Sequence, residues 1–163
     1  MALTFEDLIA SLRASRSNFH EHLEGLREDQ WDWKPYPECK SIRESLIHLV
    51  VDDRVAVWAF DADGEPDYEA FVTAATAEAG ADINRLKDML DTSFTTLLEQ
   101  LVSRYADSPL DTEVSTFGSP RKLGVAIPFF SSEDYYHTGQ VAFIRMASDP
   151  TWNYYAAIYG FGE

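Results

Sequence analysis

EDYYHTGQVAFIR, the stretch Glu133–Arg145, carries the strongest indication of how this chain folds. Wound as a helix at about 100° per residue, this stretch and its flanks gather apolar side chains on one face. The apolar members of that face are Phe129, Tyr136, Phe143, Ile144 and Ala147. The polar members of the same face are Glu133, His137 and Gln140, and the side predicted to point to water holds Asp134, Thr138 and Arg145. Polar groups on a buried face cost free energy unless a partner satisfies them, and a metal ion is a partner that an acid and an imidazole can share.

Helical periodicity extends through most of the chain. Thr4 is a predicted N-cap, and the helix after it is expected to end near Gly25. The stretch Ser41–Glu44 fits a capping box, which starts a second helix that runs to about Asp61. The two later helices are predicted over Ile83–Tyr105 and from about Phe129 to Ala147.

The connections between these helices are long. Residues 31–37 (WDWKPYP) form an aromatic connector that cannot continue a helix. Residues 61–80 are predicted to form a short helix or a lid, and residues 108–128 a loop or a short hairpin. The C-terminal tail is too aromatic to stay in solvent and is expected to pack on the helices or on a second subunit. The sequence therefore predicts one domain over residues 1–163, an all-α four-helix bundle with long connections and an aromatic C-terminal tail.

The composition excludes several classes of function. Of the 163 residues, 28 are acidic and 13 are lysine or arginine, and the net charge of -15 repels phosphate backbones and anionic lipid surfaces. Neither a nucleic acid nor a membrane is therefore expected as a partner, and no stretch is apolar enough to span a bilayer. The first residues do not read as a signal peptide. The single cysteine, Cys39, excludes an intrachain disulfide and is predicted to be unreactive, so a cytoplasmic location is expected.

Glu133 and His137 are the first two candidate metal ligands. Their spacing of one helical turn brings both side chains to neighbouring points on one helix face, as in helical zinc sites. The alternative is an ordinary ion pair on a surface helix. His48 is the third candidate, because the second and fourth helices of a bundle can face each other across the core. Two histidines and one carboxylate leave coordination positions open and suit zinc, iron, nickel or manganese.

Other polar residues near these candidates have more than one possible role. Asp52 follows His48 by one turn, and it is a fourth ligand, a hydrogen-bond partner of His48 or a solvated acid. Asp53 is a weaker candidate for the same site. Tyr136 and Gln140 either contact a substrate or a metal-bound water, or only satisfy polar groups in the core. The histidines that are predicted to be structural or exposed are His20 and His22.

The order and spacing of several short motifs resemble the DinB-like (YfiT-like) family of metalloenzymes. These motifs are Trp33-Lys34-Pro35, Ser41-Ile42, Leu46-Ile47-His48-Leu49, His137-Thr138-Gly139-Gln140 and Ile144-Arg145. The resemblance implies a four-helix bundle, frequently dimeric, with a divalent metal held by three histidines. One of these comes from the second helix and two come from an HxxxH motif on the fourth. His48 and His137 match two of the ligands, and Glu133 stands where the family usually has the third histidine.

The resemblance also implies an activity. Members of the family with an assigned reaction look like metal-dependent transferases or isomerases that use a low-molecular-weight thiol. By this interpretation, a divalent metal, with zinc the first candidate, binds His48, Glu133 and His137 and activates a thiol or water against a small electrophilic substrate. The alternative is a metal-free dimeric binding or stress-response module, in which Glu133 marks a degenerate metal site.

Overall fold

The computed structural model describes residues 3–62 and 64–161, which are predominantly helical. The long helices are α1 (Phe5–Leu23), α2 (Ile42–Ala59), α4 (Ile83–Tyr105) and α5 (Leu123–Ser148). The shorter elements are η1 (Glu28–Gln30), α3 (Tyr68–Ala79), the strands β1 (Glu113–Thr116) and β2 (Ser119–Lys122), and α6 (Tyr154–Tyr159). The predicted all-α fold is confirmed.

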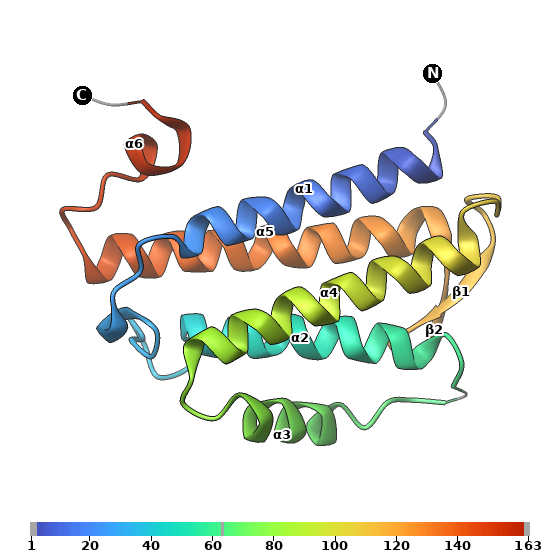
Figure 1. Ribbon diagram of the computed structural model, residues 1–163, viewed down its shortest axis with the longest axis horizontal. Helices are drawn as coiled ribbons and strands as arrows, with labels where there is room; N and C mark the ends of the chain where they lie inside the picture. Colours follow the sequence, from blue (N-terminus) through green and yellow to red (C-terminus); the bar gives the residue numbers. More distant parts are fainter. Residues whose placement is uncertain (1–2, 63, 162–163) are drawn as a thin grey trace.

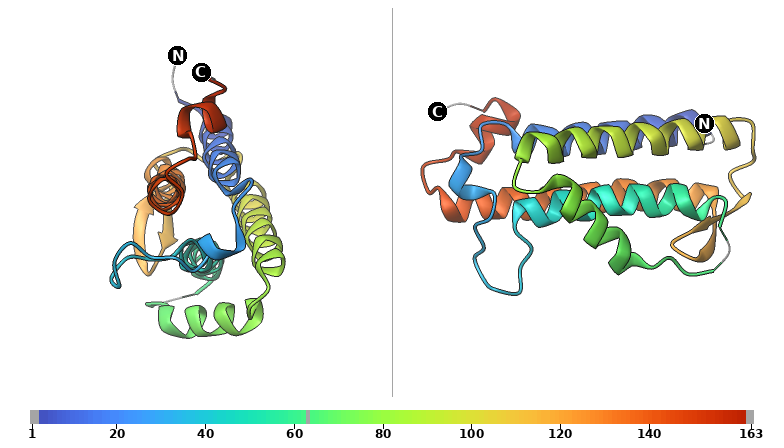
Figure 2. Two further views of the ribbon diagram at one scale, coloured as in Figure 1. Left: turned by 90° about the vertical axis from the view of Figure 1, so that its left-hand side faces the viewer. Right: turned by 60° about the horizontal axis from the view of Figure 1, so that its bottom comes forward.

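The long helices lie side by side and enclose a shared interior (Figures 1 and 2). Helix α1 packs along α5, and α2 packs along α4, while α3 covers the outer side of α2. Two apolar clusters fill the interior, one toward each end of the helices. Fully buried members of these clusters include Leu12, Phe19, Leu46, Leu90, Leu97 and Ile127. No helix in the described part of the chain is long and apolar enough to cross a membrane.

Capping boxes start the first two long helices, where the sequence predicts an N-cap at Thr4 and a capping box at Ser41–Glu44. The Thr4 hydroxyl accepts a hydrogen bond from the Asp7 amide, and the Asp7 carboxylate accepts from the Thr4 amide. Ser41 and Glu44 make the same reciprocal pair at the start of α2. Each N-cap of this kind stabilises its helix by about 1 kcal/mol. The start of α2, the helix that carries His48, is therefore encoded in its own first turn.

Helix α5 begins at Leu123, six residues before the predicted start at Phe129. Its first amides need no side-chain cap, because the Leu123 and Gly124 amides donate to the carbonyls of Thr112 and Leu110, both at 2.8 Å. A side chain at position 124 would meet the Leu110 carbonyl at 3.2 Å, so this close approach favours glycine. The β1–β2 hairpin over 113–122 and helix α3 within 61–80 correspond to two of the alternatives expected for these connections.

The predicted orientation of α5 is wrong for several of its residues. Asp134, Thr138 and Arg145 were expected to face water, but all are buried, and Asp134 is 0% exposed. Conversely, the side chains of Tyr136 and Phe143 are 63% and 50% exposed. His137 and Ile144 of the predicted inner face are buried as expected, so the apolar pattern of α5 places only part of that face correctly.

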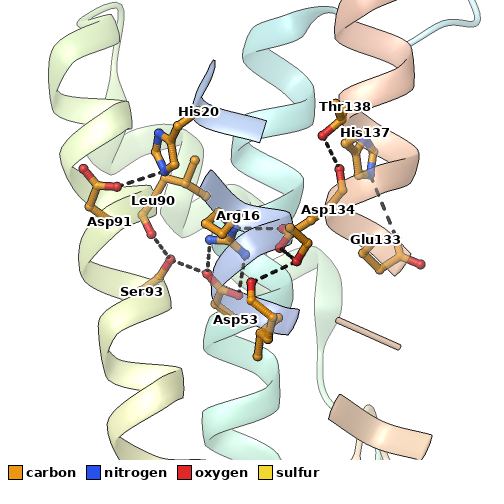
Figure 3. Close-up of polar contacts among 12 residues, drawn as sticks. Arg16, His20, Asp53, Leu90, Asp91, Ser93, Glu133, Asp134, His137 and Thr138 are labelled. Carbon is orange, nitrogen blue, oxygen red and sulfur yellow. Dashed lines mark hydrogen bonds and ion pairs between the residues drawn. The ribbon is translucent and has the colours of Figure 1, made fainter. Parts of the chain in front are cut away.

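A buried ion-pair network explains why Asp134 faces inward (Figure 3). Arg16 of α1 donates from Nε to Asp134 at 2.8 Å, and its Nη1 and Nη2 donate to the two carboxylate oxygens of Asp53 at 3.0 and 3.1 Å. The hydroxyl of Ser15 donates to Asp134, and the hydroxyl of Ser93 on α4 donates to Asp53. One arginine therefore joins α1, α2 and α5, and Ser93 adds α4. Asp53, a weaker metal candidate from the sequence, belongs to this network.

Arg145 is buried for a different reason. Its Nη1 donates to the main-chain carbonyls of His22 and Glu24 at 2.7 Å, where α1 ends. A cation satisfies helix C-terminal carbonyls well because these groups carry partial negative charge. The guanidinium also lies 4.2 Å from the ring centroid of Trp152 in the C-terminal tail.

The C-terminal tail packs partly on the bundle. Trp152 covers Arg145, and the ring of Tyr154 lies 5.8 Å from that of His22. Beyond these contacts the aromatic side chains are open to solvent, and the exposed ones are Tyr155, Tyr159 and Phe161. The expectation of a tail packed on the helices therefore holds for its first residues.

Candidate metal centre

His48 of α2 lies next to Glu133 and His137 of α5. The Nε2 atom of His48 is 3.7 Å from Glu133 Oε2, and Nε2 of His137 is 4.0 Å from the same oxygen. One potential ligand atom from each of the three residues lies within 4.8 Å of the other two. Figure 3 shows Glu133 and His137 one turn apart on α5. The arrangement places two imidazoles and one carboxylate around a common point, a donor set that could hold a divalent metal ion.

His137 has the most unusual environment of the three. Its side chain is 1% exposed, and neither ring nitrogen has a hydrogen-bond partner within the described residues. Gln140 lies near enough to favour the protonated form of the ring, but no well-formed hydrogen bond joins the two side chains. A buried polar group without a partner costs about 1–3 kcal/mol. A metal bound at Nε2 would remove part of this cost.

Both imidazoles are held in the form that binds metals. Burial lowers the pKa of His48 to about 4, and the nearby Lys40 ammonium adds to the effect. Burial also lowers the pKa of His137 to about 4, and His48 contributes further. Both rings are therefore neutral at pH 7 and need not lose a proton to act as ligands. Burial raises the pKa of Glu133, since its half-buried carboxylate is partly desolvated.

Asp52 lies next to His48, and the hydroxyl of Tyr68 contacts both residues. The Tyr68 hydroxyl donates to Asp52 Oδ1 at 2.7 Å and lies 2.5 Å from Nδ1 of His48. The second oxygen of Asp52 is 3.4 Å from Nε2 of His48. Burial raises the pKa of Asp52 to about 7, although the Tyr68 hydroxyl opposes this shift. Asp52 is therefore not a solvated acid, and it is linked to His48 through the Tyr68 hydroxyl.

Tyr68 is the residue of this site that sequence analysis missed. It opens α3, directly after the N-cap Asp67, whose side chain accepts from the Ala70 amide. Nothing local in the sequence marks it as functional, because its position depends on how α3 packs against α2. The α3 helix thus covers the site and also supplies one of its polar groups.

The remaining candidates lie in several different places. Tyr136 is exposed, with its ring 5.2 Å from that of His137, and Gln140 has an amide oxygen without a hydrogen-bond partner in the described residues. His22 is buried and bonds through Nδ1 to the Asn18 carbonyl at 2.7 Å, and His20 pairs with Asp91 at 3.1 Å. His22 is thus buried, with no hydrogen-bond partner for its Nε2 in the described residues, and His20 is half-exposed. Cys39 is a half-buried free thiol.

A Tyr68→Phe variant is expected to bind divalent metal about 10–100-fold more weakly than the wild type. Groups that orient a ligating histidine through its other nitrogen typically contribute this much. The phenylalanine keeps the ring and removes only the hydroxyl that contacts His48 and Asp52. Isothermal titration with Zn²⁺ measures the change, with Tyr155→Phe on α6 as the matched control. Equal affinity in wild type and Tyr68→Phe would rule out an orienting role for the hydroxyl.

Comparison with known protein families gives a match over most of the chain. Residues 11–141 match the family model described as the DinB superfamily. No curated protein matches this chain. The matched range includes the site residues of α2 and α5, from His48 to His137, and it ends before the aromatic tail. Because the match spans most of the 163 residues, the chain belongs to the DinB superfamily.

Proposed function

We propose that this protein is a divalent-metal-dependent enzyme whose metal ligands are His48, Glu133 and His137. The observation that carries the proposal is the buried imidazole of His137, which has no hydrogen-bond partner in the described residues and lies beside Glu133 and His48. Neutral imidazoles next to a carboxylate form a site with an excess of electron-pair donors, which is complementary to a cation. Zinc is the metal we favour, with nickel, iron and manganese as the other candidates for this ligand set.

The proposed chemistry is transfer of a low-molecular-weight thiol to a small electrophilic substrate, or a related isomerisation. A bound divalent ion would supply Lewis acidity, which lowers the pKa of a thiol or water in the site. Asp52, whose pKa lies at about 7 because of burial, can take up a proton near neutral pH, and Tyr68 holds it in place. The choice of a thiol over water rests on the resemblance to family members with an assigned reaction.

A cavity beside His48 could admit the substrate. It has a volume of about 740 Å³ and is bordered by His48 and Tyr68 on one side and by the loop before α2 on the other. Pockets for small molecules commonly have volumes of about 300–1,000 Å³. The cavity is therefore large enough for a thiol and an acceptor together.

Metal analysis tests the proposal most directly. Elemental analysis of protein purified without a histidine tag is expected to find about one divalent ion per chain. Dialysis against a chelator is expected to abolish thiol transfer to a model electrophile such as 1-chloro-2,4-dinitrobenzene, and adding the same metal back is expected to restore it. Protein that binds no Zn²⁺, Ni²⁺, Fe²⁺ or Mn²⁺ after reconstitution would refute the proposal.

The second candidate function is a metal-free dimeric binding module. The observation in its favour is the exposure of large apolar side chains on α5 and in the tail, which a second subunit could cover. These side chains are Tyr136, Phe143, Met146, Tyr155, Tyr159 and Phe161. Light scattering coupled to gel filtration tests the dimer, and a dimer without metal would favour this function over the enzyme.

A further inference from the structure

Lys40 is a cation without an ion pair among the described residues, in the loop that leads into α2. Two other cations border the same cavity, and both are paired. Lys34 Nζ lies 2.6 Å from Glu44 Oε2, and Arg43 Nε lies 2.7 Å from Asp32 Oδ1. In a chain with a net charge of -15, cations are scarce and acidic partners are plentiful. Glu38 also lines the cavity without an ion pair among the described residues, and Lys40 is the one cation of that lining that a ligand can reach without breaking a salt bridge.

The position of Lys40 relates it to the candidate metal centre. Lys40 and His48 line the same cavity, so the ammonium and one proposed metal ligand face a common space. A divalent ion held by two neutral imidazoles and one carboxylate keeps a net positive charge. Lys40 adds to that charge instead of balancing it. An anion placed between the ion and Lys40 would be attracted to both.

Cys39 and Lys40 also separate two cavities. The first is the cavity beside His48, and the second, of about 280 Å³, lies along α5. The walls of the second cavity are mainly apolar and are formed by Pro35, Tyr136, Phe143 and Ile144. Gln140 lines it as well, and its amide oxygen has no hydrogen-bond partner within the described residues. A ligand at Lys40 therefore has a polar site on one side and an apolar site on the other.

We propose that the site binds an amphipathic anion, with its acidic group between Lys40 and the metal centre and its apolar part in the cavity along α5. The inference rests on the proposed function, because it names the substrate class of the same centre. The second cavity, at about 280 Å³, is larger than the ~150 Å³ of an apolar cavity that binds benzene, so it has room for a phenyl ring or a short alkyl chain.

Binding of two matched probes tests the proposal. The acid 3-phenylpropanoate and the neutral alcohol 3-phenylpropan-1-ol share an apolar part and differ in charge. Titration calorimetry is carried out on the Zn²⁺-loaded and on the metal-free protein. The acid is expected to bind more tightly than the alcohol. Lys40→Ala should weaken binding of the acid about tenfold, which corresponds to about 1.4 kcal/mol. Lys40→Arg keeps the charge and should bind the acid as the wild type does.

Two further variants serve as controls. Lys122→Ala removes one positive charge at the end of β2, where the side chain lines neither cavity, so binding of the acid should not change. Phe143→Ala opens the apolar cavity and should weaken 3-phenylpropanoate more than acetate. Both positions are on the surface or half-buried, so these variants are expected to fold.

The possible outcomes separate this inference from the proposed function. Unchanged acid binding in Lys40→Ala, equal binding of acid and alcohol, or no saturable binding of the acid would each overturn the inference. If Zn²⁺ binds and any of these results is found, the metal-dependent function stands and only the substrate class is wrong. If no metal binds but the acid still binds to the metal-free protein in a Lys40-dependent way, the anion site stands without the metal.

Discussion

The Arg16→Met variant is expected to lose about 3–5 kcal/mol of unfolding free energy, the range found when one partner of a buried ion pair is removed. Arg16 is 3% exposed and contacts Asp53 and Asp134 at 2.8–3.1 Å. Although burial alone would lower its pKa, the two carboxylates raise it, so the guanidinium stays charged. Methionine fills much of the same volume but leaves both acids in the interior without their cation. Urea denaturation followed by circular dichroism measures the loss.

The loss is expected to grow with pH. Burial raises the pKa of Asp134 from 3.8 to about 6 even though Arg16 opposes the shift. An acid whose pKa is higher in the folded state contributes stability below its unfolded pKa, and this stability is lost as the pH rises through the folded value. Without Arg16 the folded pKa of Asp134 should rise further. The difference between wild type and Arg16→Met should therefore be larger at pH 8 than at pH 5.

A triple variant distinguishes unpaired charge from lost packing. Arg16→Met combined with Asp53→Asn and Asp134→Asn removes all three charges and should recover part of the lost stability, since a buried ion network can often be replaced at little cost. Arg16 also lies 4.2 Å from the ring centroid of Phe94. A triple variant no more stable than Arg16→Met would attribute the loss to this packing. A single variant as stable as the wild type would contradict a stabilising role for the network.

The helices of this fold could be predicted from the sequence because their starts are encoded locally. The capping boxes at Thr4 and Ser41 use residues three apart in the chain, and the apolar repeat over 83–105 gives α4 with its observed bounds. The orientation of α5 could not be predicted in the same way. Asp134 is buried because of Arg16, which is 118 residues away in the sequence. A helical wheel takes account only of residues on its own helix, so it misplaces an acid whose buried partner lies on another helix.

Some residues of the candidate site could be predicted from local sequence, and others depend on contacts between distant parts of the chain. Glu133 and His137 are one turn apart on a single helix, so their proximity follows from helix geometry. His48 could be added because α2 and α5 are neighbours in the fold that the resemblance implies. Tyr68 and Lys40 could not be found, since their relation to the histidines depends on how α3 and the loop before α2 are placed. Sequence periodicity locates the helices, but it does not give the positions of loops and covering helices.

The His137→Ala variant is expected to bind Zn²⁺ more than 100-fold more weakly than the wild type. Removal of residues that only orient a ligand already costs about 10–100-fold, and His137 is a proposed ligand itself. The stability of the metal-free protein should change less than for Arg16→Met. Alanine leaves a small cavity, but it also removes two buried ring nitrogens without hydrogen-bond partners in the described residues. Competition against a chelating dye at pH 7 measures the affinity, because both imidazoles are neutral there.

Comparison with a second histidine on a long helix makes this experiment specific. His20→Ala on α1 removes a half-exposed histidine that pairs with Asp91, and it should bind Zn²⁺ as the wild type does. His48→Ala should behave like His137→Ala, because each removes one of the two imidazoles next to Glu133. If Zn²⁺ affinity is lost in His48→Ala and His137→Ala but not in His20→Ala, the metal is bound by residues of both α2 and α5. Retained affinity in His137→Ala would mean that any bound metal lies elsewhere, and the unpaired nitrogens of His137 would then need another explanation.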